Sequence, residues 1–405
     1  MLYLCEIVLK NQIRNNILMK WENIILIAFC LLICISCKKE KEMTLSGLNI
    51  RDFQMEVEGQ LTDLYVLKNK NGMEACITNY GARLVSLLAP DRNGKMEDIV
   101  CGFPTIADYM DNKQYFGATV GRYIGRISNA TFTLDSIVYH LTANDGSHCI
   151  HGGNPGFASK IWQAEQLDEN ALKLTLFSPD GDNGFPGNLQ IRVIYVLTND
   201  NELDIHYEAE TDKPTVINLS HHSFFNISGD FNTTVSDQSL YINADYYTPY
   251  DSLKCVTGEL LPVAGTPFDF TTPHLIGERI DQNMKQLTAM KGYDHNWVLN
   301  TKGDDKKLAL RLFDDKSGRV LEVYTTEPGL QMYTANALSG AMIGKKGIAY
   351  KKRSGVSLEP QHFTDSPNNS QFPSTVLRPG EKYYSRSIYR FGVTNHAFME
   401  NTSDK

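Results

Sequence analysis

The chain has 405 residues, of which 42% are hydrophobic and 21% charged, and its formal net charge is −8. This composition is ordinary for a globular chain with a real core, and the length suffices for one large domain or for two to three ordinary ones. The negative balance argues against a nucleic-acid partner, because phosphate binding needs a concentrated positive field.

An apolar leader comes first in the chain. Residues 23–36 read NIILIAFCLLICIS and are followed by Cys37 and the charged run KKEKE. A run of about 14 residues is short for a membrane span, which needs about 20, but it has the size of the apolar region of a secretory signal. Because Met19 would begin such a signal compactly, we hypothesise that translation starts there and that residues 1–18 are an upstream extension of the reading frame.

The end of residues 1–37, Cys-Ile-Ser-Cys, resembles the cleavage box of bacterial lipoproteins, although Cys34 stands where an aliphatic residue is usual. The resemblance implies cleavage before Cys37 and a lipid on its sulfur. Residues 38–50 would then be a spacer, and the rest of the chain would be exported, in the periplasm or tethered to the outer membrane of a bacterium. The lipid would be the chain's membrane contact. A plain membrane anchor and a cleaved soluble signal are the alternatives.

Four of the eight cysteines belong to this leader. The others are widely scattered and include no Cys-x-x-Cys pair; they are Cys76, Cys101, Cys149 and Cys255. They do not form a disulfide framework of the small secreted type, and a large core does not need one. We therefore expect mostly buried thiols.

From about Arg51 onward the dominant hydrophobic period is two. Odd-numbered positions are apolar throughout Leu189–Leu197, and positions 203–209 repeat the pattern. Even-numbered positions do the same at 172–176 and 308–312. Such alternation is typical of strands that have one face on a core and the other on solvent.

Turn signals separate these segments, for example at Asp180–Gly184 and Asn199–Asn201. The best candidate for a long helix is Leu275–Met290, which is only weakly amphipathic. Many short strands with antiparallel-style turns predict an all-β fold. We expect one large antiparallel β-sandwich domain over residues 51–395, followed by a tail at 396–405.

Polar residues that interrupt a strand pattern are the place to look for function. Such motifs are, in chain order, GRYIGRI at 121–127, HCIHGG at 148–153, NLSHHSFFN at 218–226, GYDHN at 292–296 and SLEPQHFTDSPN at 357–368. Taken singly, each has a structural explanation, such as a surface ion pair for Arg126 or a capped loop for His151. Only one of His221 and His222 can face inward, because side chains alternate along a strand.

Two kinds of chemistry are alternatives at this point. Zinc could be bound by imidazoles from His148, His151, His221 and His222, but their spacing matches no compact zinc signature, and we predict no metal. A glycosidase would need paired carboxylates, for which the candidates are Asp294, Glu359 and Asp365. The distances between these carboxylates do not follow from the sequence.

In order and spacing, the motifs resemble those of the aldose 1-epimerase family: Arg-Ile, His-Gly-Gly, Asn-Leu-x-x-His-x-x-Phe-Asn, Asp-His-Asn and Glu-x-Gln. The resemblance runs from about Gln54 to Phe391, and the ordered set is highly specific, whereas a lone His-Gly-Gly would be weak. It implies a large β-sandwich, which agrees with the strand pattern. It also implies an isomerase that interconverts the α and β anomers of aldohexoses such as glucose and galactose, without a cofactor.

Carried over residue by residue, the resemblance implies His222 as the general acid and Glu359 as the general base. It also implies ligands for the sugar, namely Arg126, His151, Asp294 and Gln331. Neutral sugars also need an apolar platform, for which the candidates are Phe224, Phe225 and Tyr333.

The motifs depart from the family pattern at two positions near the site. Gly125 stands where the family usually has Asn, and Thr364 stands where it has Pro in Phe-Pro-Asp. The departure at Gly125 favours the alternative function, a non-catalytic sugar-binding surface lipoprotein. A related branch acts on sugar phosphates, but it would require more basic residues in the cleft than Arg126 and Arg122.

Overall fold

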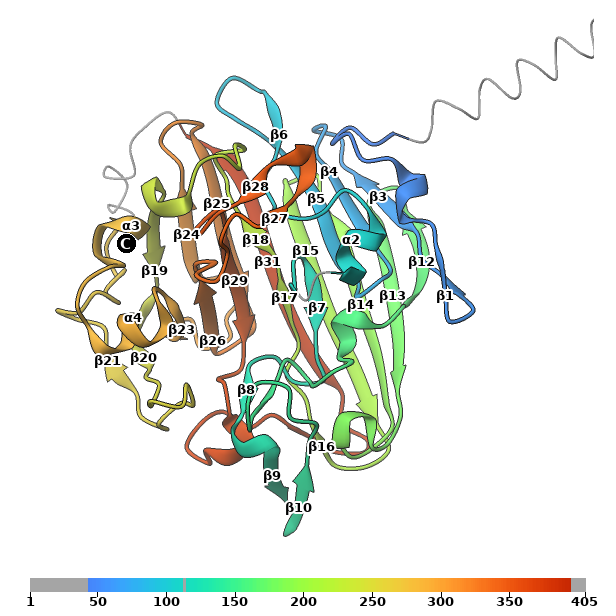
Figure 1. Cartoon of the computed structure of the whole chain (residues 1–405), viewed down its shortest axis with the longest axis vertical. Coiled ribbons are helices and arrows are strands. Elements are labelled where there is room, and N and C mark those ends of the chain that lie inside the picture. The colour runs from blue at the N-terminus through green and yellow to red at the C-terminus, as the bar shows by residue number, and fades with distance from the viewer. Residues whose placement is uncertain (1–42, 112–113, 395–405) are drawn as a thin grey trace, which may run out of the picture.

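The computed structural model describes residues 43–111 and 114–394 (Figure 1). Strands dominate these ranges, and the pairs of named strands run antiparallel, which confirms the predicted all-β fold. The α-helices of the described part are short: α2 (Ile106–Asp111), α3 (Ile276–Arg279) and α4 (Lys285–Met290). Among these residues, no helix is both long and apolar enough to cross a bilayer.

The largest layer is a nine-stranded sheet that runs through the molecule (Figure 1). Its strands are, in spatial order, β12 (Gln163–Asp168), β13 (Ala171–Ser178), β14 (Leu189–Leu197), β15 (Glu202–Thr211), β31 (Tyr383–Val393), β25 (Arg319–Thr325), β24 (Leu310–Phe313), β19 (Ser239–Ile242) and β22 (His274–Leu275). The alternation predicted for β14 is confirmed, since its odd-numbered residues are buried and the others are half-buried or exposed.

Two smaller sheets pack on the large one. The four-stranded sheet contains β3 (Leu64–Lys68), β4 (Glu74–Thr78), β5 (Arg83–Pro90) and β6 (Met96–Asp98). The six-stranded sheet contains β18 (Phe224–Phe225), β29 (Val356–Gln361), β26 (Gly329–Tyr333), β23 (Asp294–Leu299), β20 (Ala244–Thr248) and β21 (Leu261–Pro262). One buried apolar cluster takes side chains from all three sheets, such as Leu87, Val193 and Trp297. This shared core makes the fold a sandwich.

Short strand pairs complete the described chain. They are β1 (Glu56–Val57) with β2 (Gln60–Leu61), β7 (Ala118–Val120) with β17 (Ser220–His222), β8 (Arg126–Ile127) with β11 (Cys149–Ile150), β9 (Thr131–Leu134) with β10 (Ile137–His140), β16 (Thr215–Val216) with β30 (Val376–Leu377), and β27 (Met342–Ile343) with β28 (Ala349–Tyr350). The β9–β10 hairpin projects from one end of the molecule (Figure 1). The pairs β7–β17 and β8–β11 carry residues predicted to act in function.

The segment proposed as a single helix, Leu275–Met290, is instead divided. Leu275 pairs with β19, and residues 280–284 separate α3 from α4. Ile276, Ile280 and Leu287 are all buried, but the intervening Asp-Gln-Asn has low helix propensity. The apolar periodicity therefore reflects two separate short contacts with the core.

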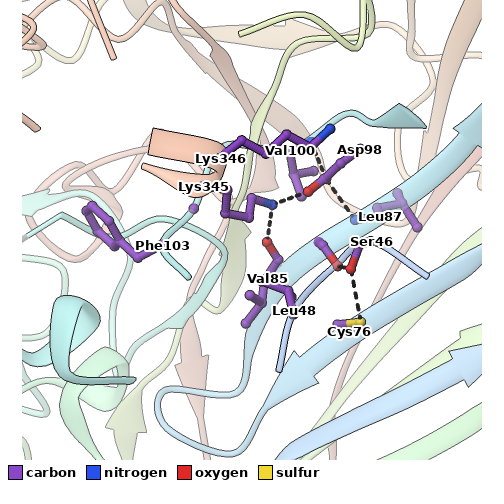
Figure 2. Close-up of polar contacts among 12 residues, drawn as sticks. Ser46, Leu48, Cys76, Val85, Leu87, Asp98, Val100, Phe103, Lys345 and Lys346 are labelled. Carbon is purple, nitrogen blue, oxygen red and sulfur yellow. Dashed lines mark hydrogen bonds and ion pairs between the residues drawn. The ribbon is translucent and has the colours of Figure 1, made fainter. Parts of the chain in front are cut away.

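A buried ion pair fastens the β27–β28 hairpin to the four-stranded sheet (Figure 2). Lys345, in the 3₁₀ turn between these strands, donates to the Val85 carbonyl and to the Asp98 carboxylate. The lysine and aspartate side chains are 5% and 3% exposed, so each charge is shielded from water and depends on the other.

The N-terminal end of the described chain also packs on this sheet. The amides of Leu45 and Ser46 each donate to the Glu74 carboxylate, at 3.1 Å. Residues 43–50, which belong to the predicted spacer, are therefore part of the folded body. The four cysteines of the body are free and buried, as expected. The predicted leader, Cys37, the Met19 start and the tail after residue 395 lie outside the described residues.

Candidate active site

Three neighbouring strands of the six-stranded sheet form the floor of a cavity. In the order β23, β26 and β29, Asn296 pairs with Gln331, and Gln331 pairs with Glu359. Side chains alternate along each strand, so Asp294, Gln331 and Glu359 face the cavity while their neighbours such as Leu358 face the core. The register of one sheet thus brings three predicted site residues together.

His222 reaches the same cavity from β17. Its Nε2 lies 3.4 Å from Glu359 Oε1, and its Nδ1 lies 3.4 Å from Ser357 Oγ. The preceding His221 points away, into the core, where its Nε2 is 3.0 Å from Ser223 Oγ. The alternation along β17 therefore selects His222 as the histidine of the cavity, as the motif spacing predicts.

Arg126 lies on β8, and His151 lies in the turn after β11, the strand that pairs with β8. Arg126 Nε donates to Asp145 Oδ2 at 2.7 Å, and the side chain lines the cavity. The His151 ring meets the His222 ring edge to face, with centroids 5.3 Å apart. The Gly125 amide donates to His151 Nδ1 at 3.3 Å, so the neutral ring carries its proton on Nε2 as a donor.

The cavity measures about 170 Å³, below the roughly 300–1,000 Å³ typical of pockets for drug-sized ligands, so it suits a ligand the size of one sugar ring. All six predicted catalytic and substrate-binding residues line it. The lining residues for which the motifs predict no role are Gln114, Tyr115, Gly125, Ile150, Tyr250, Gln361 and Thr364. Gln361 belongs to the Glu-x-Gln motif and could have been chosen from it, whereas Gln114 and Tyr115 belong to no motif.

Several buried polar atoms at the cavity have no hydrogen-bond partner within the described chain, although Glu359 Oε1 lies 3.4 Å from His222 Nε2. They are Gln331 Oε1, Glu359 Oε1 and both amide atoms of Gln361. Gln331 Nε2 donates to Asp294 Oδ1 at 2.7 Å, which fixes the orientation of that amide. A buried polar atom without a hydrogen bond costs about 1–3 kcal/mol of folding free energy. These atoms are therefore available to form hydrogen bonds with the hydroxyl groups of a ligand.

Burial shifts Glu359 and His222 toward their uncharged forms. It raises the pKa of Glu359 to about 8, and the nearby Asp294 charge adds to this shift. It lowers the pKa of His222 to about 4, with a further contribution from the Arg83 guanidinium. Between these values the pair of side chains binds one proton, which in the empty cavity lies on Glu359.

The other cavity groups respond to burial in the same way. The pKa of His151 lies well below its ordinary value, because burial and the proximity of His222 both disfavour an imidazolium. Burial also raises the pKa of Asp294, although Arg126 and the Gln331 amide oppose that shift. The empty cavity is thus close to neutral, which suits an uncharged ligand with many hydroxyls.

Some residues considered for function lie elsewhere. Phe224 and Tyr333 line the cavity, but Phe225 packs in the central core and is wrong as a platform. Asp365 accepts from the Ser128 amide at 3.0 Å and does not line the cavity. His148 contacts Cys255, with Sγ 3.5 Å from Nδ1. In the described ranges, no three His, Cys, Asp or Glu side chains are grouped as a metal site would require.

Comparison with known proteins agrees with these observations. A model of the aldose 1-epimerase family matches residues 63–390. Galactose mutarotase from Homo sapiens is 39% identical over 318 residues, which cover 78% of this chain and 90% of the human protein. Aldose 1-epimerase from Escherichia coli K12 is 36% identical over 338 residues, which cover 82% of this chain and 96% of the bacterial protein.

Two solved structures share the fold. An aldose epimerase homologue from C. elegans superposes with a TM-score of 0.77 at 31% identity, covering 82% of this chain and 100% of that chain. Galactose 1-epimerase from Lactobacillus acidophilus superposes with a TM-score of 0.75 at 30% identity, covering 84% of this chain and 97% of that chain. The resemblance inferred from the ordered motifs is thereby confirmed, and the chain belongs to the aldose 1-epimerase family.

Proposed function

We propose that this protein interconverts the α and β anomers of aldohexoses such as glucose and galactose. The observation that carries the proposal is the contact between His222 Nε2 and Glu359 Oε1, at 3.4 Å, in a cavity that also contains Arg126, Asp294 and Gln331. The family name and the relatives' names support the same reaction.

Anomer exchange needs a base and an acid at neighbouring oxygens. The base removes the proton of the C1 hydroxyl, the electrons of that O–H bond form the C1 carbonyl, and the C1–O5 bond breaks as the acid protonates O5. Rotation about C1–C2 and the reverse transfers close the ring with the other face exposed. The protein ends with the same single proton on its pair, so the reaction needs no other reactant.

The proposed assignment, with Glu359 as base and His222 as acid, requires the shared proton on His222. In the empty cavity burial keeps it on Glu359 instead. Sugar binding would favour transfer of this proton from Glu359 to His222, because hydroxyl donors stabilise a carboxylate and the ring-oxygen lone pair stabilises an imidazolium. The short distance between the two side chains allows this transfer without any movement of the strands.

The remaining ligands would hold the ring in place. Arg126 and His151 Nε2 present donors, and the Asp294 carboxylate presents acceptors, to hydroxyls that do not react. Gln331 bonds to Asp294 and pairs with Glu359, so it connects the positioning groups with the base.

Polarimetry of freshly dissolved α-glucose and α-galactose tests the proposal. We expect wild-type protein to shorten the approach to the equilibrium rotation well below the buffer rate. Rates equal to buffer for every aldohexose tried would contradict it, and calorimetric sugar binding without acceleration would assign a sugar-binding protein instead.

We also propose that the mature protein is exported and carries a lipid on Cys37. The apolar run at 23–36, the small residue before Cys37 and the charged residues after it support this proposal.

A further inference from the structure

The two positions at which the motifs depart from the family pattern, Gly125 and Thr364, lie against each other. A Cβ added to Gly125 would be 2.8 Å from Thr364 Oγ1, closer than real Cβ contacts. Both residues line the cavity, as Arg126 does. The space that a side chain at position 125 would enter is therefore occupied by the Thr364 hydroxyl.

The loop that carries Thr364 is anchored on both sides of this residue. The Tyr123 hydroxyl donates to the Phe363 carbonyl at 2.9 Å, and the Asp365 amide donates to the Arg126 carbonyl at 3.0 Å. Thr364 itself is 2% exposed, and its branched Cβ restricts its rotamers. Its hydroxyl consequently occupies a fixed position relative to Arg126.

Polar groups continue along the wall from Thr364. Burial raises the pKa of Tyr250 to about 12, while the nearby polar side chains of Thr364 and Gln331 act against that shift. Gln331 in turn donates to Asp294 at 2.7 Å. Thr364 thus lines the same cavity as Tyr250, Gln331 and Asp294, the last two of which bond to each other. A ligand hydroxyl placed beside Arg126 would lie near these polar groups.

We propose that Thr364 is a specificity-determining residue whose hydroxyl binds one non-anomeric hydroxyl of the sugar, in the space left by the absence of a side chain at position 125. The inference rests on the proposed aldohexose function, which it deepens by naming an additional substrate contact. The hydroxyl is a donor and an acceptor, so it suits a neutral sugar hydroxyl. Removal of the Thr364 hydroxyl should lower kcat/KM for sugars that have the contacted hydroxyl and leave it unchanged for sugars that lack this hydroxyl.

The test is Thr364→Val, which keeps the branched shape and removes the hydroxyl. Mutarotation and calorimetric binding are measured with the better of glucose and galactose and with its 2-, 3-, 4- and 6-deoxy analogues. We expect kcat/KM for the parent sugar to fall about 3- to 10-fold, mostly through KM, which is the usual range for one neutral hydrogen bond. With one deoxy analogue the variant and the wild type should be equal.

Thr364→Ser retains the hydroxyl and should retain most of the parent-sugar activity. Thr175→Val is the matched control on β13, because its Oγ1 bonds only to the Gln163 carbonyl outside the cavity, at 3.4 Å. A Thr364→Val variant that matches wild type with every sugar would overturn the inference. So would an equal loss with all five sugars, because that pattern indicates a structural role.

Gly125→Ala provides an independent test. The added methyl would displace the Thr364 hydroxyl and would also strain the backbone, because Gly125 has φ +84°. The variant should therefore lose activity with every sugar and more with those that have the contacted hydroxyl, and Thr364→Val should add little to that sugar-dependent part. Additive losses in the double variant would contradict the proposed contact. If wild type accelerates no sugar, the proposed function fails; if wild type is active but Thr364→Val shows no selectivity, only this inference fails.

Discussion

At the scale of single residues, the proposed chemistry depends on two side chains whose pKa values burial shifts in opposite directions. Glu359 keeps its proton up to about pH 8, and His222 stays neutral down to about pH 4. The two groups have one proton between them over a wide range, which is the amount that ring opening and closure require. The apparent values belong to the coupled pair in the empty cavity.

The pH dependence of kcat/KM should consequently be bell-shaped. Below about pH 4 His222 takes a second proton and the pair has no base, and above about pH 8 Glu359 loses its proton and the pair has no acid. Polarimetry across this range, with the buffer-catalysed rate subtracted at each pH, measures both limbs. A rate that keeps rising well above pH 8 would be incompatible with a shared proton.

Glu359→Gln should abolish proton transfer while it leaves the cavity in place. We expect kcat to fall about 10²- to 10⁴-fold, the usual contribution of one positioned acid or base, with sugar affinity within a few fold of wild type. Polarimetry and calorimetry measure the two quantities, and full retained activity would exclude Glu359 from proton transfer.

The same substitution should change the pH dependence of stability. The unfolded carboxyl ionises near its ordinary pKa of 4.5, but the folded one ionises only near 8. Wild type therefore loses stability as pH rises between these values, because the folded state binds the proton more tightly. Glutamine does not titrate, so denaturant midpoints of Glu359→Gln should decline less than those of wild type over this interval.

At the scale of elements, antiparallel register and side-chain alternation assemble the cavity floor. β23, β26 and β29 each place polar side chains on the cavity face and apolar ones on the core face. The hydrophobic contacts that stabilise the sandwich thus also hold the proposed catalytic groups at fixed separations. Loops contribute the less regular parts, such as Tyr115 and Thr364.

The buried Lys345–Asp98 pair should be an important tertiary contact of the β27–β28 hairpin. Lys345→Met leaves the Asp98 charge buried without its partner and should cost about 3–5 kcal/mol of unfolding free energy. Lys346→Met is the matched control, because Lys346 pairs at the surface with Glu97 at 3.4 Å and should cost at most about 1 kcal/mol. Urea unfolding of both variants measures this difference, and equal midpoints would refute it.

At the scale of the whole molecule, the described body contains every proposed catalytic and sugar-binding residue, while Cys37 lies before it. Anchoring and catalysis should therefore be separable. Full-length Cys37→Ala should lose fatty-acid labelling and retain the uncleaved apolar run at 23–36, yet show wild-type mutarotation per mole of protein. An absence of labelling in wild type would show that Cys37 is not lipidated.

Local pattern was sufficient to predict the all-β class and strands such as β14, whereas the six cavity residues followed from the resemblance of the ordered motifs to a known family. The physical reason is that apolar and polar residues alternate along a strand of which one face is buried, and this alternation can be read from neighbouring positions. The choice of His222 over His221 also follows from alternation, once one inward-facing residue of the motif is identified.

Other properties depend on contacts between segments far apart in the chain. Lys345 and Asp98 are separated by 247 positions, and nothing near either one indicates its partner. In the sequence, Gly125 and Thr364 are two separate departures from the family pattern, and only the fold shows that Gly125 lies next to the Thr364 hydroxyl. The location of the shared proton likewise depends on burial of Glu359 and His222 by several strands, which tertiary packing creates and a local pattern does not contain.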